Sequence, residues 1–128
     1  HVVSAFAAAL DELDAEGGVE ARHTRYVANQ KTMVEGMRAL GFRTLIGDEV
    51  QSPIITSFYY PDAAGFDFQK FYDALKSRGF VIYPGKVSHA QCFRIGSIGD
   101  VHLEDMTALV DHVFEVMEEM GVRLAVAG

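Results

Sequence analysis

Apolar residues recur every three or four positions through the first part of the chain, which is the period of an amphipathic helix. Val3, Phe6 and Leu10 lie on one face of a helix predicted over Val2–Glu16, and the pair Gly17-Gly18 ends it. A second helix is predicted over residues 19–40, with Gly41 as its left-handed cap. The stripe along this helix consists of Val19, His23, Tyr26, Gln30, Met33, Met37 and Leu40.

The middle of the chain changes to short β-branched and aromatic runs between turn residues, a pattern typical of strands. Four strands are predicted, over residues 42–46, 54–60, 80–83 and 92–95. Pro84-Gly85 is expected to end the third strand. Two more amphipathic helices are predicted. One is marked by Phe68, Phe71, Tyr72 and Leu75 and ended by Gly79, and the other covers residues 103–120.

The predicted order is helix–helix–strand–strand–helix–strand–strand–helix, which gives an α/β fold of the small α+β type. We expect a four-stranded sheet with helices on one face. Residues 1–120 would form a single domain, with two long helices over 1–40 and the sheet with its helices over 42–120, followed by a tail over 121–128. The two long helices have more apolar surface than a small sheet needs, so we expect them to cover a neighbouring domain or a partner subunit.

Composition narrows the possible partners. The chain has 128 residues, enough for one domain, and its net charge of -7 argues against nucleic acid and against an anionic membrane. A single cysteine, Cys92, allows no internal disulfide, which fits a cytoplasmic protein. We find no apolar run of membrane-spanning length and no signal peptide. Because His1 leads straight into a helical pattern without an initiating Met, we expect the chain to be cut from a longer one.

Several reactive side chains have simpler interpretations than catalysis. His89 and Cys92 form an isolated H-x-x-C, but zinc requires three or four ligands, so no metal site is predicted. Ser52 and the pair Ser88-His89 lack the sequence of a nucleophile elbow. Lys86 follows a strand in Tyr-Pro-Gly-Lys, and we favour a solvated turn lysine over a Schiff-base lysine there.

Arg94 is the most informative residue, because it interrupts the otherwise apolar strand over residues 92–95. A buried guanidinium is costly without a partner. Either an internal carboxylate pairs with Arg94, or an anionic ligand does. The planar fork of arginine suits the second role, because it binds carboxylate or phosphonate through two parallel hydrogen bonds.

Long runs of the chain resemble one family, the 2-aminoethylphosphonate–pyruvate aminotransferases, a class V branch of the fold-type I pyridoxal-phosphate enzymes. The resemblance extends from His1 to about Val116. It rests on Glu16-Gly17-Gly18-Val19, Arg25-Tyr26, Asn29-Gln30, Gln51-Ser52-Pro53-Ile54-Ile55-Thr56-Ser57-Phe58, Gly79-Phe80-Val81-Ile82-Tyr83-Pro84-Gly85-Lys86-Val87-Ser88, Cys92-Phe93-Arg94-Ile95-Gly96 and Ile98-Gly99. Ser97, where the family usually has Asn, and Leu103, where it often has Pro, depart from the pattern.

The resemblance implies the C-terminal small domain of a homodimeric enzyme of phosphonate degradation. Such an enzyme moves the amino group of 2-aminoethylphosphonate to pyruvate and forms phosphonoacetaldehyde and L-alanine. It implies that Arg94 binds the substrate's carboxylate or phosphonate. The family's cofactor lysine, its aspartate and its phosphate-binding groups belong to a preceding large domain. We therefore expect no catalytic, cofactor-binding or metal-binding residue here, and an inactive isolated chain.

Two other interpretations remain open. One is a free-standing α+β module that binds an anion through Arg94. The other is a purely structural module that dimerises through its two long helices.

Overall fold

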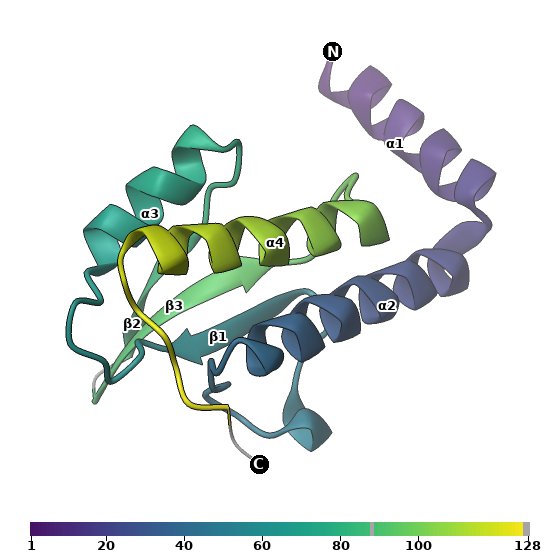
Figure 1. Ribbon diagram of the computed structural model, residues 1–128. Coiled ribbons are helices and arrows are strands. Elements are labelled where there is room, and N and C mark those ends of the chain that lie inside the picture. Colours follow the sequence, from purple (N-terminus) through teal and green to yellow (C-terminus); the bar gives the residue numbers. More distant parts are fainter. Residues whose placement is uncertain (88, 127–128) are drawn as a thin grey trace.

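The computed structural model describes residues 1–87 and 89–126, with the side chains of residues 86 and 87 excepted (Figure 1). These residues form four helices: α1 (Val2–Glu16), α2 (Gly18–Ala39), α3 (Phe68–Ser77) and α4 (Leu103–Glu119). A short 3-10 turn, η1, covers Asp48–Val50. The strands are β1 (Ile55–Tyr59), β2 (Tyr83–Val87) and β3 (Ala90–Gly96). All four predicted helices are therefore confirmed, with ends that differ by at most two residues.

Local chemistry explains where the helices begin and end. The Asp67 carboxylate accepts a hydrogen bond from the backbone N–H of Lys70 at 3.0 Å, which caps the start of α3. Asp105 accepts from the His102 N–H at 2.8 Å and closes a capping box at the start of α4. At the end of α2, Gly41 adopts a φ of 97°, a left-handed conformation that favours glycine.

In the described part of the chain the sheet has three strands rather than the predicted four, in the order β1-β3-β2 with both pairs antiparallel. Residues 42–46 make only an isolated bridge, between Thr44 and Phe58. Backbone hydrogen bonds from Leu45 to Ser57 and from Tyr59 to Arg43 flank it. The prediction of a strand here was wrong because the chain turns away at Gly47 into η1 before a ladder can form.

The boundaries of β2 also differ from those predicted. The strand begins at Tyr83 and continues through Pro84 and Gly85, which were expected to end it. A proline is tolerated because β2 lies at the edge of the sheet. Gly85 is required for close packing, since a Cβ at this position would lie 2.8 Å from Cys92 Sγ and 2.9 Å from the Cys92 carbonyl oxygen.

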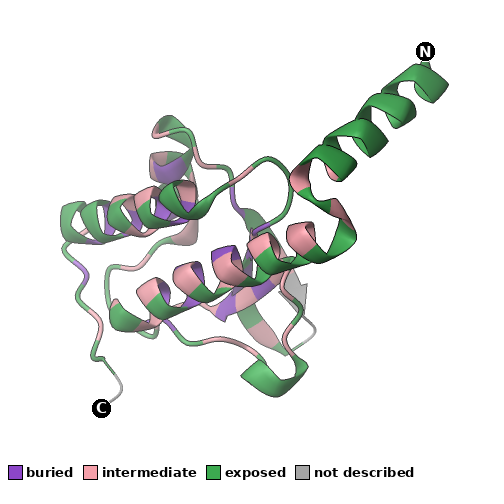
Figure 2. Ribbon diagram, turned by 90° about the vertical axis from the view of Figure 1, so that its right-hand side faces the viewer, coloured by how far each residue is buried: buried purple, intermediate pink, exposed green. Residues whose placement is uncertain are grey.

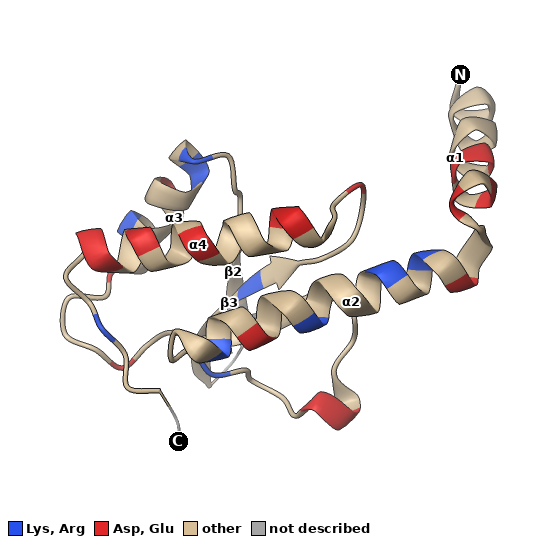
Figure 3. Ribbon diagram, turned by 45° about the vertical axis from the view of Figure 1, so that its right-hand side comes forward, with Lys and Arg blue, Asp and Glu red and all other residues tan. Residues whose placement is uncertain are grey.

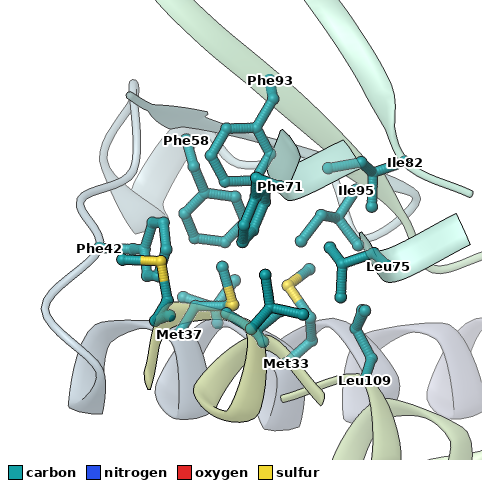
Figure 4. Packing of buried hydrophobic residues seen from close by; sticks show 14 of the residues in the cluster. Met33, Met37, Phe42, Phe58, Phe71, Leu75, Ile82, Phe93, Ile95 and Leu109 are labelled. Atoms are coloured by element: carbon teal, nitrogen blue, oxygen red, sulfur yellow. The ribbon is translucent and has the colours of Figure 1, made fainter. Parts of the chain in front are cut away.

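The core lies between one face of the sheet and three helices. Phe58, Phe93 and Ile95 point from the sheet into this layer, where Met33 of α2 and Leu109 of α4 meet them (Figure 4). Because α2, α3 and α4 all contribute to the same cluster, the prediction of helices on one face is confirmed. Helices α2 and α4 approach closely at Gly36, where a Cβ would lie 2.7 Å from a methyl group of Val110.

Helix α1 contributes nothing to this core. It extends away from the body of the chain and has no buried residue (Figure 2). Val2, Val3 and Phe6 are 84%, 80% and 64% exposed. In contrast, Val122, within the segment predicted as a tail, is buried against the core cluster. No helix among the described residues is long and apolar enough to cross a membrane.

Candidate functional site

Arg94 lies on the open face of the sheet. Side chains alternate along a strand, so the buried Phe93 and Ile95 on either side of it point toward the helices. Arg94 therefore points the other way and is exposed. The sequence argument assumed a buried guanidinium, and this premise was wrong because the strand is covered by helices on one face only.

The guanidinium of Arg94 keeps most of its donors available. Its Nη2 donates one long hydrogen bond, of 3.3 Å, to the backbone carbonyl of Pro84 in β2. Within residues 1–87 and 89–126, no carboxylate lies within ion-pair distance of it. Of the two partners considered from the sequence, an internal carboxylate is therefore not found in the described part of the chain.

Each of the other arginines has a side-chain partner among the described residues. Arg43 lies over the ring of Tyr59, with 5.3 Å between the guanidinium carbon and the ring centroid. The remaining arginines each form an ion pair with a glutamate or aspartate: Arg22, Arg25, Arg38, Arg78 and Arg123. Among the described residues, Arg43 and Arg94 are the two arginines without an ion pair, and Arg94 is the one that lies within a strand of the sheet and has no aromatic ring against its guanidinium. This arrangement suits recognition of an external anion.

The surroundings of Arg94 on the open face are set by the strand register. Ser57 of β1 and Tyr83 of β2 lie directly opposite Arg94, one on each side. Side chains of opposite residues share a face and have Cβ atoms about 4.5–5.5 Å apart. The residues two positions away along β3 are Cys92 and Gly96, which are small. A ligand can therefore approach the guanidinium from above the sheet without displacing a bulky side chain from β3.

The other candidates from the sequence do not join Arg94 in a cluster. Ser52 is exposed, and its Oγ accepts a hydrogen bond of 3.4 Å from the Ile54 N–H. His89 is exposed, whereas Cys92 is fully buried. Ser88 and the Lys86 side chain lie outside the described residues. Among the residues that the structure describes, no three His, Cys, Asp or Glu side chains are grouped to hold a metal ion.

A polar cluster at the junction of α1 and α2 was not predicted as a unit. The Arg25 side chain pairs with Glu16 and donates to the carbonyls of Gly99, at 2.8 Å, and Val101, at 2.7 Å. Asn29 is fully buried and donates to the same Val101 carbonyl at 2.8 Å. These bonds hold the loop after β3 against α2. Figure 3 shows the acidic end of α1 beside the basic first half of α2.

The electrostatics of this cluster follow from its geometry. Hydrogen bonds from Arg25 and from Arg22, the latter at 2.7 Å, lower the pKa of Glu16 to about 2. Glu16 also raises the pKa of Arg25. The only sequence signal was that Glu16, Arg25-Tyr26 and Asn29-Gln30 all belong to the matched family segments. Arg25, Tyr26 and Asn29 bond the loop directly, and Glu16 holds Arg25 in place. Gln30 instead donates to Thr56 of β1, at 3.4 Å.

The two departures from the family pattern lie near the same loop. Ser97 is fully buried, and its Oγ donates to the Pro53 carbonyl at 2.8 Å, linking the end of β3 to the segment before β1. Leu103 is the first residue of α4 and is 47% exposed. Neither residue is a cross-strand neighbour of Arg94. Both therefore affect the segments next to the site rather than the surroundings of the guanidinium.

Comparison with known proteins supports the resemblance stated from the sequence. The chain is 66% identical over 115 residues to the 2-aminoethylphosphonate–pyruvate transaminase of Bacteroides fragilis, which covers 90% of this chain and 32% of that protein. It is 64% identical over 113 residues to the protein of the same name from Phocaeicola vulgatus, covering 88% of this chain and 31% of that one. The chain therefore spans about a third of the length of the curated relatives that it matches. No family model matches it.

The fold is shared with solved aminotransferases. The crystal structure of pyridoxamine–pyruvate aminotransferase from Mesorhizobium loti superimposes with a TM-score of 0.79 over 93% of this chain and 31% of that one, at 28% sequence identity. The prediction of a small domain of the fold-type I aminotransferase kind is confirmed at the level of the fold.

Proposed function

We propose that this chain is the substrate-anchoring small domain of a 2-aminoethylphosphonate–pyruvate aminotransferase. The observation that carries the proposal is the exposed guanidinium of Arg94, which lacks a carboxylate partner among the described residues. Both substrates are anions, a phosphonate and a carboxylate, and a fixed arginine fork binds either through two parallel hydrogen bonds. The high identity to relatives of that name supports the choice of substrates.

In the proposed enzyme Arg94 serves orientation. Holding the anionic end of a substrate fixes the position of its reacting carbon relative to the guanidinium. That carbon is bonded directly to the carboxylate in pyruvate and is separated from the phosphonate by one methylene group in 2-aminoethylphosphonate. Binding energy far from the reacting bond then lowers the entropic part of the barrier. The same residue would serve both half-reactions, because each substrate carries an anionic group within two bonds of its reacting carbon.

The expected cofactor is pyridoxal 5'-phosphate, which supplies the electron sink of transamination. The described residues of this chain do not fit a complete site for it. Lys31, Lys70 and Lys76 are exposed on helices, whereas a cofactor lysine needs a desolvated position that lowers its pKa. We therefore assign the cofactor to a large domain, as in the family.

The proposal also explains why this chain leaves one face of its sheet and the apolar side of α1 uncovered. The relatives are about three times as long as this chain. A large domain would cover the open face of the sheet and the apolar side of α1, where Phe6 and Leu10 are 64% and 44% exposed. We further propose a homodimeric, cytoplasmic enzyme of phosphonate breakdown, with the domain boundaries predicted from the sequence.

The test is substitution of Arg94 in the full-length protein that contains this chain. Arg94→Ala is expected to lower kcat/KM for 2-aminoethylphosphonate and for pyruvate by about a hundredfold or more, since a charged hydrogen-bond pair contributes about 1.5–3 kcal/mol per bond. Arg94→Lys, which keeps the charge but loses the fork, should restore only part of this loss. Unchanged steady-state kinetics in Arg94→Ala would remove Arg94 from the substrate site.

The alternative of a free-standing anion-binding module is tested on the chain alone. Calorimetry with 2-aminoethylphosphonate, pyruvate and phosphonoacetate is expected to show no saturable binding if the large domain completes the site. Saturable binding that is lost in Arg94→Ala would instead favour the module.

A further inference from the structure

Arg94 has different neighbours on its two sides. On β1 the opposite residue is Ser57, whose hydroxyl stays close to the plane of the sheet because the side chain is short. On β2 the opposite residue is Tyr83, a long side chain that is 54% exposed. Of these two residues, Tyr83 is the one long enough to place a polar atom at the height of the guanidinium. The site is therefore asymmetric, with a hydroxyl donor at the β2 side.

The hydrogen bond that Arg94 makes supports this geometry. Its Nη2 donates to the carbonyl of Pro84, which follows Tyr83 in β2, so the guanidinium lies toward β2 rather than toward β1. No hydrogen bond of the Tyr83 hydroxyl is found within the part of the chain that the structure describes. A phenol hydroxyl both donates and accepts, and on this face it is available to an external acceptor.

We propose that Tyr83 is a specificity-determining residue that favours phosphonate over carboxylate at the Arg94 site. The inference rests on the proposed function and refines it. A carboxylate is planar and has two oxygens, both of which the arginine fork can engage. A phosphonate is tetrahedral and has a third oxygen outside the plane of that fork. The Tyr83 hydroxyl donates to this third oxygen, and a carboxylate has none to offer there.

The experiment uses Tyr83→Phe in the full-length protein, because this change removes the hydroxyl and keeps the ring. A lost hydrogen bond to a charged acceptor predicts that kcat/KM for 2-aminoethylphosphonate falls about ten- to a hundredfold, with kcat/KM for pyruvate within about twofold of the parent value. Tyr59→Phe is the matched control. Tyr59 lies on β1, opposite Cys92 rather than Arg94, so the same loss of a hydroxyl should change neither value.

A ratio of two inhibition constants does not depend on what fraction of the variant protein is folded. Competitive inhibition constants are measured for ethylphosphonate and for propionate, which differ only in the anionic group. The ratio of the two constants should move toward propionate by about tenfold or more in Tyr83→Phe and stay unchanged in Tyr59→Phe.

The outcomes separate this inference from the function on which it rests. If Arg94→Ala impairs both substrates but Tyr83→Phe leaves the phosphonate-to-carboxylate ratio unchanged, the role of Tyr83 is refuted and the proposed function stands. Equal losses for both substrates in Tyr83→Phe would also refute it, because the hydroxyl would then not discriminate. If Arg94→Ala has no effect, the proposed function and this inference both fail.

Discussion

Replacing Phe93 with alanine should destabilise the chain more than most single substitutions. Phe93 is fully buried in the central strand β3. Its ring centroid lies 5.5–6.3 Å from those of its aromatic neighbours, Phe42, Phe58, Tyr60, Phe68 and Phe71. Truncation of a buried Phe costs about 3–5 kcal/mol, and aromatic pairs add about 0.5–1.5 kcal/mol each beyond burial. With rings packed on several sides the cavity cannot collapse easily, so we expect about 4–5 kcal/mol.

The assay is urea unfolding followed by far-ultraviolet circular dichroism, with the free energy of unfolding obtained by linear extrapolation. Phe93→Leu, which removes less volume, should lose about 1–2 kcal/mol and stay folded for comparison. Phe114, on α4, is 51% exposed, so Phe114→Ala is the control and should cost less than about 1 kcal/mol. A loss below about 2 kcal/mol in Phe93→Ala would refute the assignment of Phe93 to the centre of a rigid core.

Two further predictions concern helix packing and pH. Gly36→Ala should destabilise the chain by about 1–3 kcal/mol despite the better helix propensity of alanine, because the new Cβ meets Val110 at 2.7 Å. Val110→Ala should recover part of this loss in the double mutant, and additive losses in urea unfolding would contradict the contact. Because the pKa of Glu16 is lowered from 4.5 to about 2, its pairing with Arg25 should stabilise the chain above pH 4.5 and weaken as the pH falls through 2. Glu16→Gln should remove this acid-dependent change in thermal unfolding, and an unaltered pH profile would disprove the coupling.

Sequence periodicity predicted the helices well and the sheet less well. Helices such as α4 have long apolar stripes and a capping box at the start, and both signals can be read from neighbouring residues without knowledge of the tertiary structure. A short run such as residues 42–46 satisfies strand propensity, but pairing depends on a partner distant in sequence, and only Thr44 finds one. Pro84-Gly85 has the propensity of a turn but lies within strand β2. Because β2 is an edge strand, the backbone N–H that proline lacks costs the sheet little stability.

The sequence identified Arg94 as the candidate site residue but did not reveal which residues surround it. Arg94 stood out as the one charge in an apolar strand. Its exposure could not be deduced, because an apolar run reads the same whether one or both faces are covered. The cross-strand neighbours Ser57 and Tyr83 are separated from Arg94 by 37 and 11 positions, and only the register reveals them. The contacts of Arg25 and Asn29 with the loop at Gly99–Val101 were hidden for the same reason.

The strand order has a consequence for how the chain folds as it is synthesised. β3 is the central strand but the last of the three along the sequence, so β1 and β2 have no partner in the sheet until residues 90–96 leave the ribosome. Until then β1 is limited to its hydrogen bonds with Arg43 and Leu45, and β2 has no strand beside it, while α3 between them is the local element that can form first. The sheet is completed when β3 pairs with β1 and β2. Because β3 also carries Arg94, the same step places the guanidinium at its site between Ser57 and Tyr83.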